Sequence, residues 1–338
     1  MTPLGQDADE TSALSAICRR TPNMGIVFVI GVLILLGLVL LLIREARRSP
    51  GAMRWGKRPV WKKRIRIGLV VLLLILAVLG FWVVLIEPNR LVIHRETIQI
   101  ENWPPELSGL RIAVISDIHT GGPFINDQKL RDIVAMTNAL NPDLIVLLGD
   151  YMSSNSWHSH RVEPGVTAAA LKNLKAPLGV YAVLGNHDWW YSGERVRGAL
   201  EANGIPVLED DVAEIKWHEK PFWLVGLADL WTRPQHVSAT IAKVPAGSTI
   251  IALTHNPDIF PNLPQTVPLL IAGHTHGGQV NFPLFGTPIV PSRFGRKYTA
   301  GHLFENGHHL FVTTGIGTSI LPVRFRVPPE IVLLTVTP

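Results

Sequence analysis

The chain has 338 residues, of which 47% are hydrophobic, with a mean hydropathy of +0.25 and a formal net charge of +5. This length accommodates one large domain with an appendage, or two modest domains. The single cysteine, Cys18, excludes a disulfide framework and a thiolate metal cluster within one chain. A net positive charge is compatible with a nucleic-acid partner. Whether such a partner is expected depends on where the basic residues lie along the chain.

Two uncharged apolar segments, residues 24–43 and 67–86, precede the rest of the chain. Each has about the twenty residues that a helix needs to cross the hydrocarbon core of a bilayer. Neither has the short apolar core and small-residue cleavage site of a signal peptide. We therefore expect two transmembrane helices after a disordered segment, residues 1–23, with either Met1 or Met24 as the true start.

The segment between the two apolar runs, residues 44–66, carries most of the excess positive charge. A short loop of this kind lies in the cytoplasm by the positive-inside rule, which places the C-terminal part of the chain on the extracytoplasmic side. A nucleic-acid-binding loop is the alternative, but the flanking apolar runs argue against it, and no nucleic-acid partner is expected. Against the one acid, Glu45, stand Arg44, Arg47, Arg48, Arg54, Lys57, Arg58, Lys62, Lys63, Arg64 and Arg66.

From residue 91 to residue 338 the composition is that of one globular α/β domain. Apolar runs alternate first with helical patterns, which is typical of βαβ units with buried strands. Asn126 and Ser192 are candidate helix N-caps. We expect strands over residues 110–115, 144–148, 179–184, 222–226, 249–254, 268–272, 309–314 and 331–336, and helices over residues 126–140, 164–174 and 192–202.

Polar side chains of metal-binding type follow five of these strands. Because alternate residues of an extended chain point the same way, Asp117 and His119 are expected to project together. The same holds for His274 and His276, which follow Gly273 in Gly-His-Thr-His-Gly-Gly-Gln. Ligands of open α/β sheets lie at the carboxyl ends of strands, so all these side chains are expected to converge. The other blocks are Gly149-Asp150, Gly185-Asn186-His187-Asp188 and Thr254-His255-Asn256.

The donor set contains only nitrogen and oxygen ligands, and it is larger than one ion can use. Two divalent cations, Mn, Fe or Zn, are therefore expected. Such a pair clamps a phosphoryl group and lowers the pKa of a shared water, which then attacks phosphorus in line with the departing oxygen. A carboxylate must bridge the two ions, and Asp150 is the natural candidate because it stands alone at the end of a central strand.

The order of the five blocks resembles the calcineurin-like metallophosphoesterase superfamily over roughly residues 108–338. The later Gly315-Ile316-Gly317-Thr318-Ser319 and Pro328-Pro329-Glu330-Ile331 look like its bacterial membrane-anchored or exported branch. Some members of that branch cleave phosphodiesters, and others are UDP-diacylglucosamine pyrophosphatases. The resemblance implies a four-layer αββα sandwich and a location in the bacterial inner membrane.

The resemblance also implies roles for individual residues. His187 would lie beside the phosphate as the catalytic acid or as a stabiliser of the transition state, and Asp188 would support the site. The residues Tyr151-Met152-Ser153-Ser154 depart from the pattern of serine/threonine protein phosphatases, so that activity is not expected. One metal would be held by Asp117, His119 and His276, the other by Asn186, His255 and His274, with Asp150 between them.

These observations predict a membrane-anchored dimetal phosphodiesterase or pyrophosphatase whose substrate is a phosphate ester, lipid-linked or from the cell envelope. An extracytoplasmic site would not reach cytoplasmic UDP-diacylglucosamine. A phosphomonoesterase is the nearest alternative. A non-catalytic receptor or scaffold with the same fold is another, although no ligand position has been lost. Arg293, Arg296 and Lys297 are candidates for binding a substrate phosphate or an anionic headgroup, and Trp189 and Trp190 for a wall of the cleft.

Overall fold

The structure is a computed structural model that describes residue 37 and residues 60–153 and 160–338. Its first described element, helix α3 (Val60–Phe81), continues through a π-helical turn (Trp82–Ile86) and a short 3-10 turn (Glu87–Asn89). Within the described residues, Ile67–Asn89 is the one helical segment long and apolar enough to cross a membrane. The other predicted span, residues 24–43, lies outside the described residues except for residue 37.

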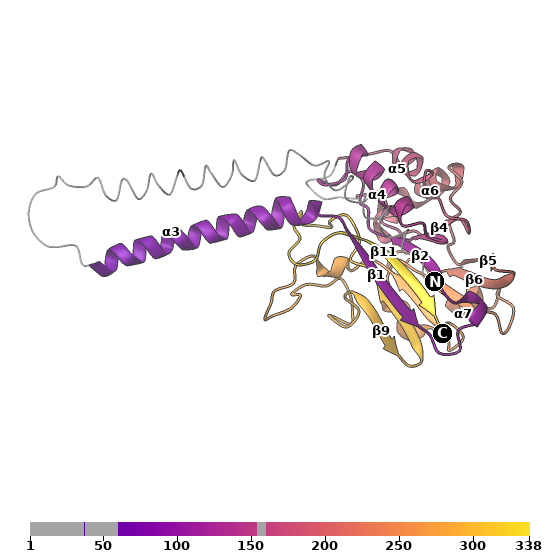
Figure 1. Cartoon of the computed structure of the whole chain (residues 1–338). Helices are drawn as coiled ribbons and strands as arrows, with labels where there is room; N and C mark the ends of the chain where they lie inside the picture. Colours follow the sequence, from indigo (N-terminus) through magenta and orange to yellow (C-terminus); the bar gives the residue numbers. More distant parts are fainter. Residues whose placement is uncertain (1–36, 38–59, 154–159) are drawn as a thin grey trace, which may run out of the picture.

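Helix α3 extends away from the domain (Figure 1), and most of its apolar side chains are exposed. It begins at Val60, so the last part of the expected basic loop, residues 60–66, is helical instead. Lysine and arginine are good helix formers, which explains how the helix extends beyond the apolar run.

The first sheet has five strands in the order β1-β11-β2-β3-β4. Strands β2, β3 and β4 are parallel, β11 is antiparallel to β2, and β1 is parallel to β11. The carboxyl ends of β2, β3 and β4 therefore lie at one edge. The bounds are β1 (Val92–Gln99), β2 (Leu110–Ile115), β3 (Leu144–Leu147), β4 (Val180–Ala182) and β11 (Glu330–Thr337).

The second sheet has six strands in the order β5-β6-β7-β8-β10-β9. Strands β6, β7, β8 and β10 are parallel, and the two edge strands are antiparallel to their neighbours. The bounds are β5 (Asp211–Trp217), β6 (Lys220–Gly226), β7 (Ile250–Leu253), β8 (Leu269–Ala272), β9 (Gly301–Glu305) and β10 (His308–Val312).

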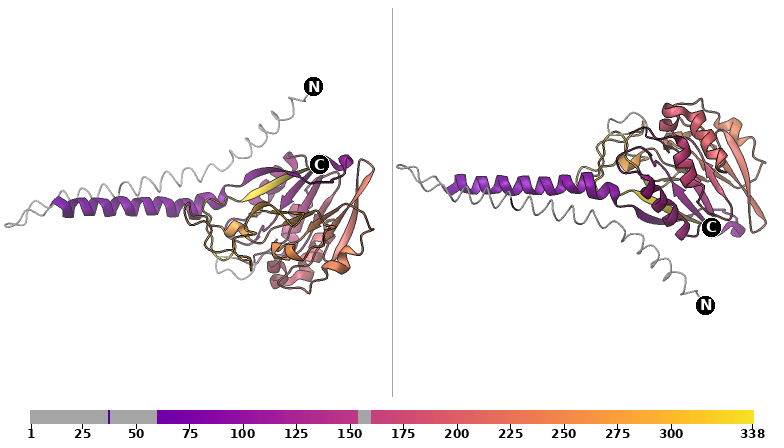
Figure 2. Two further views of the ribbon diagram at one scale, coloured as in Figure 1. Left: turned by 90° about the horizontal axis from the view of Figure 1, so that it is seen from below. Right: turned by 90° about the horizontal axis from the view of Figure 1, so that it is seen from above.

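Three hydrophobic cores separate the layers of the domain. Ile112 and Val114 of β2 pack between the sheets, whereas Ala113 and Ile115 face the helices, as the alternation of a strand requires. Both faces of the inner strands are thus buried, which is why their sequences are continuously apolar. Helices α4 (Asp127–Ala139), α5 (Pro164–Leu171) and α6 (Asn186–Ala202) cover the first sheet (Figure 2), and α7 (Val237–Ile241) and a 3-10 turn (Pro257–Asn262) cover the second.

All eight predicted strands are present to within two residues at each end, and the predicted N-cap of α4 is confirmed because Asn126 accepts a hydrogen bond from the Lys129 amide at 2.8 Å. Helix α6 begins earlier than predicted, at Asn186, where Asp188 accepts a hydrogen bond from the Gly185 amide. Ser192 has non-helical backbone angles at a kink that divides α6, so the predicted helix over residues 192–202 corresponds to the second part of α6. Strands β1, β5 and β9 were not expected.

Candidate metal centre

The polar blocks that follow β2, β3, β4, β7 and β8 meet where the carboxyl ends of the two sheets come together. The amide of His274 donates to Asp117 at 3.1 Å, and the His255 ring bonds the Leu148 carbonyl at 2.7 Å, so each contact joins one sheet to the other. Asp117, Asp150 and His255 are almost completely buried. The predicted convergence at the strand ends is therefore observed.

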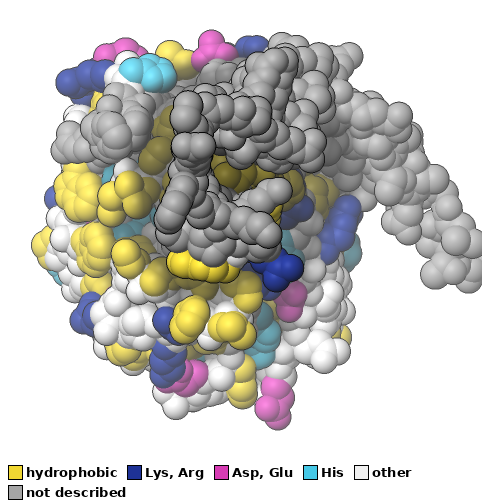
Figure 3. All heavy atoms as spheres, turned by 90° about the vertical axis from the view of Figure 1, so that its left-hand side faces the viewer, with side chains coloured by type: hydrophobic (Ala, Val, Ile, Leu, Met, Phe, Trp, Pro, Cys, Tyr) yellow, Lys and Arg dark blue, Asp and Glu magenta, His cyan; other side chains and the backbone are white. Residues whose placement is uncertain are grey.

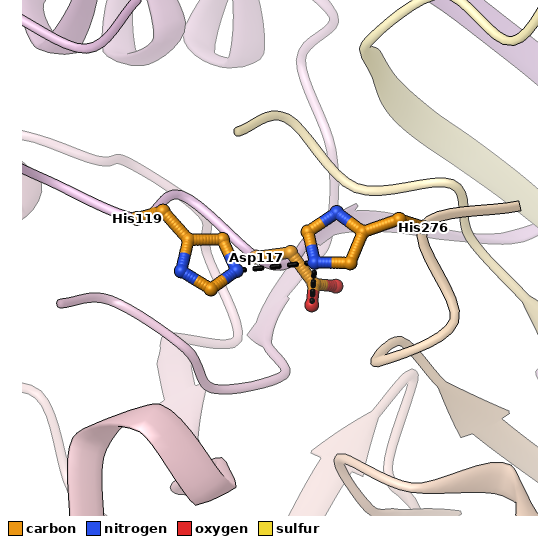
Figure 4. Close-up of side chains that lie close together, drawn as sticks. All are labelled: Asp117, His119 and His276. Atoms are coloured by element: carbon orange, nitrogen blue, oxygen red, sulfur yellow. Dashed lines mark hydrogen bonds and ion pairs between the residues drawn. The ribbon is translucent and has the colours of Figure 1, made fainter. Parts of the chain in front are cut away.

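One part of the cluster consists of Asp117, His119 and His276 (Figure 4). The Nε2 atoms of His119 and His276 face each other at 3.1 Å, and His276 Nε2 lies 3.3 Å from Asp117 Oδ1. Their ligand-type atoms all lie within 4.8 Å of one another. These are the three residues that the resemblance assigns to one metal.

The second part contains His255 and His274, whose facing nitrogens, Nε2 and Nδ1, are 3.2 Å apart. Asp150 lies between the two histidine pairs, because its Oδ2 is 3.2 Å from His255 Nε2 and 3.6 Å from His119 Nε2. Asn186, at the first position of α6, has a buried Oδ1 that accepts no hydrogen bond within the described part of the chain.

The backbone that presents these side chains is not extended, contrary to our expectation from strand alternation. Asp117, His119, Asp150, His274 and His276 all adopt the left-handed conformation, with φ between 52° and 70°. His274 consequently turns toward His255 while His276 turns toward His119. The two histidines of the Gly-His-Thr-His block thus belong to different parts of the cluster.

Close approach of the loops requires glycine at two places. A Cβ at Gly273 would lie 2.0 Å from Ser116 Oγ, and a Cβ at Gly185 would lie 2.2 Å from Asp150 Oδ1. Neither separation is sterically possible, so these glycines let the loops after β8 and β4 pack directly on the carboxylates.

Burial controls the protonation of the histidines. It lowers the pKa of His119 and of His274 to about 3, and it lowers the pKa of His276 well below its usual value. These rings are therefore neutral at pH 7 and keep a lone pair for a cation. For His255, burial alone would lower the pKa, but the neighbouring carboxylates, Asp150 first and then Asp117 and Asp229, outweigh burial and raise the pKa to about 10.

The two carboxylates, Asp117 and Asp150, have pKa values that are shifted in opposite directions. Burial raises the pKa of Asp117 to about 6, whereas for Asp150 the effect of burial is outweighed by His255 and the other nearby rings, which hold the pKa well below its usual range. Asp150 is thus ionised at neutral pH. The carboxylates favour positive charge at the Nε2 position of His255, between the two sheets.

The cluster fits a pair of divalent cations. Two pairs of ring nitrogens face each other at about hydrogen-bond distance on either side of an ionised carboxylate. The oxygens Asp117 Oδ1 and Asn186 Oδ1 are buried and accept no hydrogen bond from the described residues. Nitrogen and carboxylate donors of this kind suit Mn, Fe and Zn.

His187 and Asp188 follow directly in α6. The His187 ring contacts the His119 ring edge-on at 4.7 Å, and its Nε2 is 3.3 Å from Ser319 Oγ. Asp188 is fully buried and accepts hydrogen bonds from the amides of Asp150, Met152 and Gly185, at 2.7, 3.1 and 3.0 Å. Asp188 therefore holds the loop after β3 and cannot reach a substrate directly.

The three basic candidates for substrate binding are exposed in the long loop between β8 and β9. Arg293 pairs with Asp258 at 3.7 Å and Lys297 with Glu305 at 2.6 Å, while Arg296 lies against Gly286. Within the described residues, no hydrogen bond or ion pair joins these three side chains to the metal-ligand cluster.

Sequence reasoning missed Trp231 and Arg324 at the site, whereas it named Trp190 as a candidate for a wall of the cleft. Trp231, after β6, contacts the His274 ring edge-on at 4.3 Å, and Trp190 lies between Trp231 and His187. These two indoles line one side of the cluster, whereas Trp189 is partly buried and bonds Glu209. Arg324 is completely buried and donates to carbonyls of the loop after β10, including Gly315 and Gly317. A lone Trp or Arg in a loop gives no motif from which these roles could be predicted.

Comparison with known proteins identifies the family of the chain. The model of the calcineurin-like phosphoesterase family matches residues 110–278. The uncharacterized metallophosphoesterase YkuE of Bacillus subtilis (strain 168) is 29% identical over 253 residues, which cover 74% of this chain and 87% of YkuE. Phosphodiesterase YaeI of Escherichia coli (strain K12) is 30% identical over 261 residues, which cover 73% of this chain and 89% of YaeI.

A transmembrane protein with a metallophosphoesterase domain from Danio rerio is 33% identical over 252 residues, covering 69% of this chain and 54% of that protein. The family match ends at Gly278, in the block that contains His274 and His276. The chain therefore belongs to the calcineurin-like phosphoesterase family.

Proposed function

We propose that the protein is a membrane-anchored phosphohydrolase with two divalent cations, and that it cleaves phosphodiesters or pyrophosphates. The observation that carries this proposal is the placement of the ionised Asp150 carboxylate between two facing pairs of histidines. One cation would be held by Asp117, His119 and His276 and the other by Asn186, His255 and His274, with Asp150 shared. When bound, such a pair supplies positive charge that neutralises a phosphoryl group and acidifies water near neutral pH.

The chain's own residues would position the substrate and move the proton. His187 stands beside His119 and Ser319, at the edge of the cluster, where its ring can protonate the departing oxygen. The indoles of Trp190 and Trp231 form an apolar wall that limits water on that side. The Asp188 carboxylate accepts a hydrogen bond from the Asp150 amide and so keeps Asp150 in place.

The preference for diesters rests on the relative from Escherichia coli, which is named a phosphodiesterase and shares 30% identity with this chain. The membrane anchor rests on the exposed apolar segment Ile67–Asn89, which leads directly into β1. A substrate that is lipid-linked or part of the cell envelope would be within reach of a domain held this close to a bilayer.

Metal-reconstituted protein should hydrolyse a chromogenic phosphodiester, and Asp150→Ala or His274→Ala should reduce that activity to background while the protein stays folded. The control is His218→Ala, which removes an exposed histidine from the turn between β5 and β6 and should keep full activity. Retention of activity in either purified site variant would contradict the two-metal arrangement. A higher rate on the matched monoester than on the diester would make the protein a phosphomonoesterase instead.

A further inference from the structure

A short hairpin in the loop after β8 exposes an unbroken apolar run, Phe282-Pro283-Leu284-Phe285. Reciprocal backbone hydrogen bonds between Phe282 and Gly286, at 2.9 and 2.8 Å, close the hairpin. Leu284 is 89% exposed and Phe285 is 75% exposed. Large apolar side chains gathered at the tip of a closed turn are unfavourable in water and mark a surface that binds something apolar.

A second loop, after β10, presents Ile320 and Leu321, which are 77% and 53% exposed. Ile320 has a positive φ of 63°, an unusual conformation for a β-branched residue. The side chain of Gln279 joins this loop to the first one, because its Nε2 donates to the Leu321 and Val323 carbonyls at 2.9 and 3.1 Å. Ile289, in the first loop, is 76% exposed. We call the combined surface the apolar rim: Phe282, Leu284, Phe285, Ile289, Ile320 and Leu321.

The apolar rim lies beside the end of the apolar helix. The amide of Arg324, in the second loop, donates to the Val83 carbonyl at 3.0 Å, and Val83 is within the segment Ile67–Asn89. Val83 precedes Ile86, the last residue of the apolar run, by three residues, so this contact lies within the final helical turn of that run. Both views in Figure 2 show the loops near the domain end of α3, and the face that α3 leaves carries many hydrophobic side chains (Figure 3).

The apolar rim is also connected to the catalytic machinery. The Ser319 amide donates to Gln279 Oε1 at 2.6 Å, and the Ser319 hydroxyl is 3.3 Å from His187 Nε2. Gln279 itself follows His276 by three residues. The loop that exposes Ile320 and Leu321 thus begins at the edge of the metal-ligand cluster, next to the residue proposed to protonate the leaving group.

We propose that the apolar rim inserts into the surface of the bilayer that α3 crosses, so that the site takes amphiphilic phosphoesters from the lipid-water interface. The proposal rests on the membrane anchor of the proposed function. Continuity with α3 favours a bilayer as the occupant over a second protein, because the rim lies at the depth where the helix leaves the membrane. Arg296 lies against Gly286 of the hairpin. A basic residue beside an apolar surface is typical of protein surfaces that bind a membrane interface.

Depth-dependent quenching tests the insertion without relying on activity. Full-length protein carrying Cys18→Ser and one introduced cysteine, Leu284→Cys or Ile320→Cys, is labelled with an environment-sensitive fluorophore. It is then reconstituted into vesicles of phosphatidylethanolamine and phosphatidylglycerol. Lipids with a nitroxide near the headgroup should quench both labels. A label at Glu219→Cys, in the exposed turn at the amino end of β6 and away from the site, should be unaffected.

A label at Leu73→Cys in α3 separates failure of the insertion from failure of the anchor. Quenching at Leu73 by lipids with a nitroxide near the chain end, with no quenching at positions 284 and 320, would overturn the insertion and leave the anchored enzyme intact. No quenching at Leu73 would overturn both. Disulfide cross-linking between the 284 positions of two chains, without lipid quenching, would make a second copy the occupant and also overturn the proposal.

A matched pair of variants tests the consequence for substrate. Phe285→Asp should lower the rate on an alkyl-chain phosphodiester embedded in vesicles several-fold and leave the rate on a soluble chromogenic diester unchanged. Phe304→Asp alters an equally large exposed side chain on the edge strand β9 and should change neither rate. Equal rates for Phe285→Asp and the parent on both substrates would contradict interfacial access.

Discussion

At the scale of single residues, the most consequential feature is the left-handed backbone at the proposed ligands. Five of them have φ between 52° and 70°, in a region that costs non-glycine residues about 1–3 kcal/mol each. The conformation turns His274 and His276 in different directions, which an extended strand end would not do. The strain is held by the surrounding hydrogen bonds, such as the one from the His274 amide to Asp117.

The position of His187 is compatible with two roles, and an experiment can distinguish them. It lies close enough to His119 and Asp150 to be a ligand, yet the proposed function makes it the proton donor. His187→Gln should therefore lower kcat by about 10²–10⁴-fold, the usual contribution of a general acid, while both cations remain bound. Steady-state kinetics together with elemental analysis of the same preparation measure the two effects. Loss of one equivalent of metal would make His187 a ligand instead.

At the scale of elements, the junction of β8 with the loop after β2 determines whether the site can form. Gly273→Ala would place a methyl group 2.0 Å from Ser116 Oγ. The methyl group would push the loop after β8 away from the loop after β2, which should destabilise the protein by about 1–3 kcal/mol and weaken metal binding. Chemical denaturation and metal titration measure the two losses.

Gly198→Ala is the matched control for that substitution. Gly198 lies inside α6 with nothing within 4 Å of the added methyl group, so alanine should be neutral or stabilise the helix by up to about 1 kcal/mol. Two variants of equal stability and equal metal affinity would show that the close approach at Gly273 is not required.

The sequence predicted the interior of the fold better than its edges. The inner strands β2, β3, β7 and β8 are buried on both faces, so an unbroken apolar run marks each of them. Strands β1, β5 and β9 are edge strands with one exposed face, and their mixed sequences resemble loops.

In the candidate site, residues that follow a predicted strand could be predicted, and residues that distant segments bring in could not. Its aspartates and histidines follow predictable strands, so their convergence could be inferred from parallel topology. Trp231 and Arg324 reach the site through contacts between distant segments, and no short pattern predicts such contacts. The split of His274 from His276 depends on backbone dihedrals that binary patterning does not encode.

At the scale of the whole molecule, the basic segment, residues 44–66, predicts which side of the membrane the domain occupies. If that segment is cytoplasmic, the C-terminus at Pro338 lies outside the cytoplasm. A reporter that functions outside the cytoplasm should then be active when it is fused after Pro338, and a reporter that functions only in the cytoplasm should be inactive. Paired alkaline phosphatase and green fluorescent protein fusions measure this. Fluorescence with no phosphatase activity would reverse the predicted orientation and bring cytoplasmic nucleotide-sugar substrates within reach.

The central claim is that Asp150 joins two cations held by separate histidine pairs. Titration of chelator-treated, full-length protein with Mn²⁺, followed by electron paramagnetic resonance, tests it most directly. We expect two equivalents to bind and to give a spin-coupled signal, because ions sharing one carboxylate lie about 3.5–4 Å apart. Asp150→Asn should abolish the coupling. One equivalent per chain with the signal of an isolated ion would contradict the two-metal site.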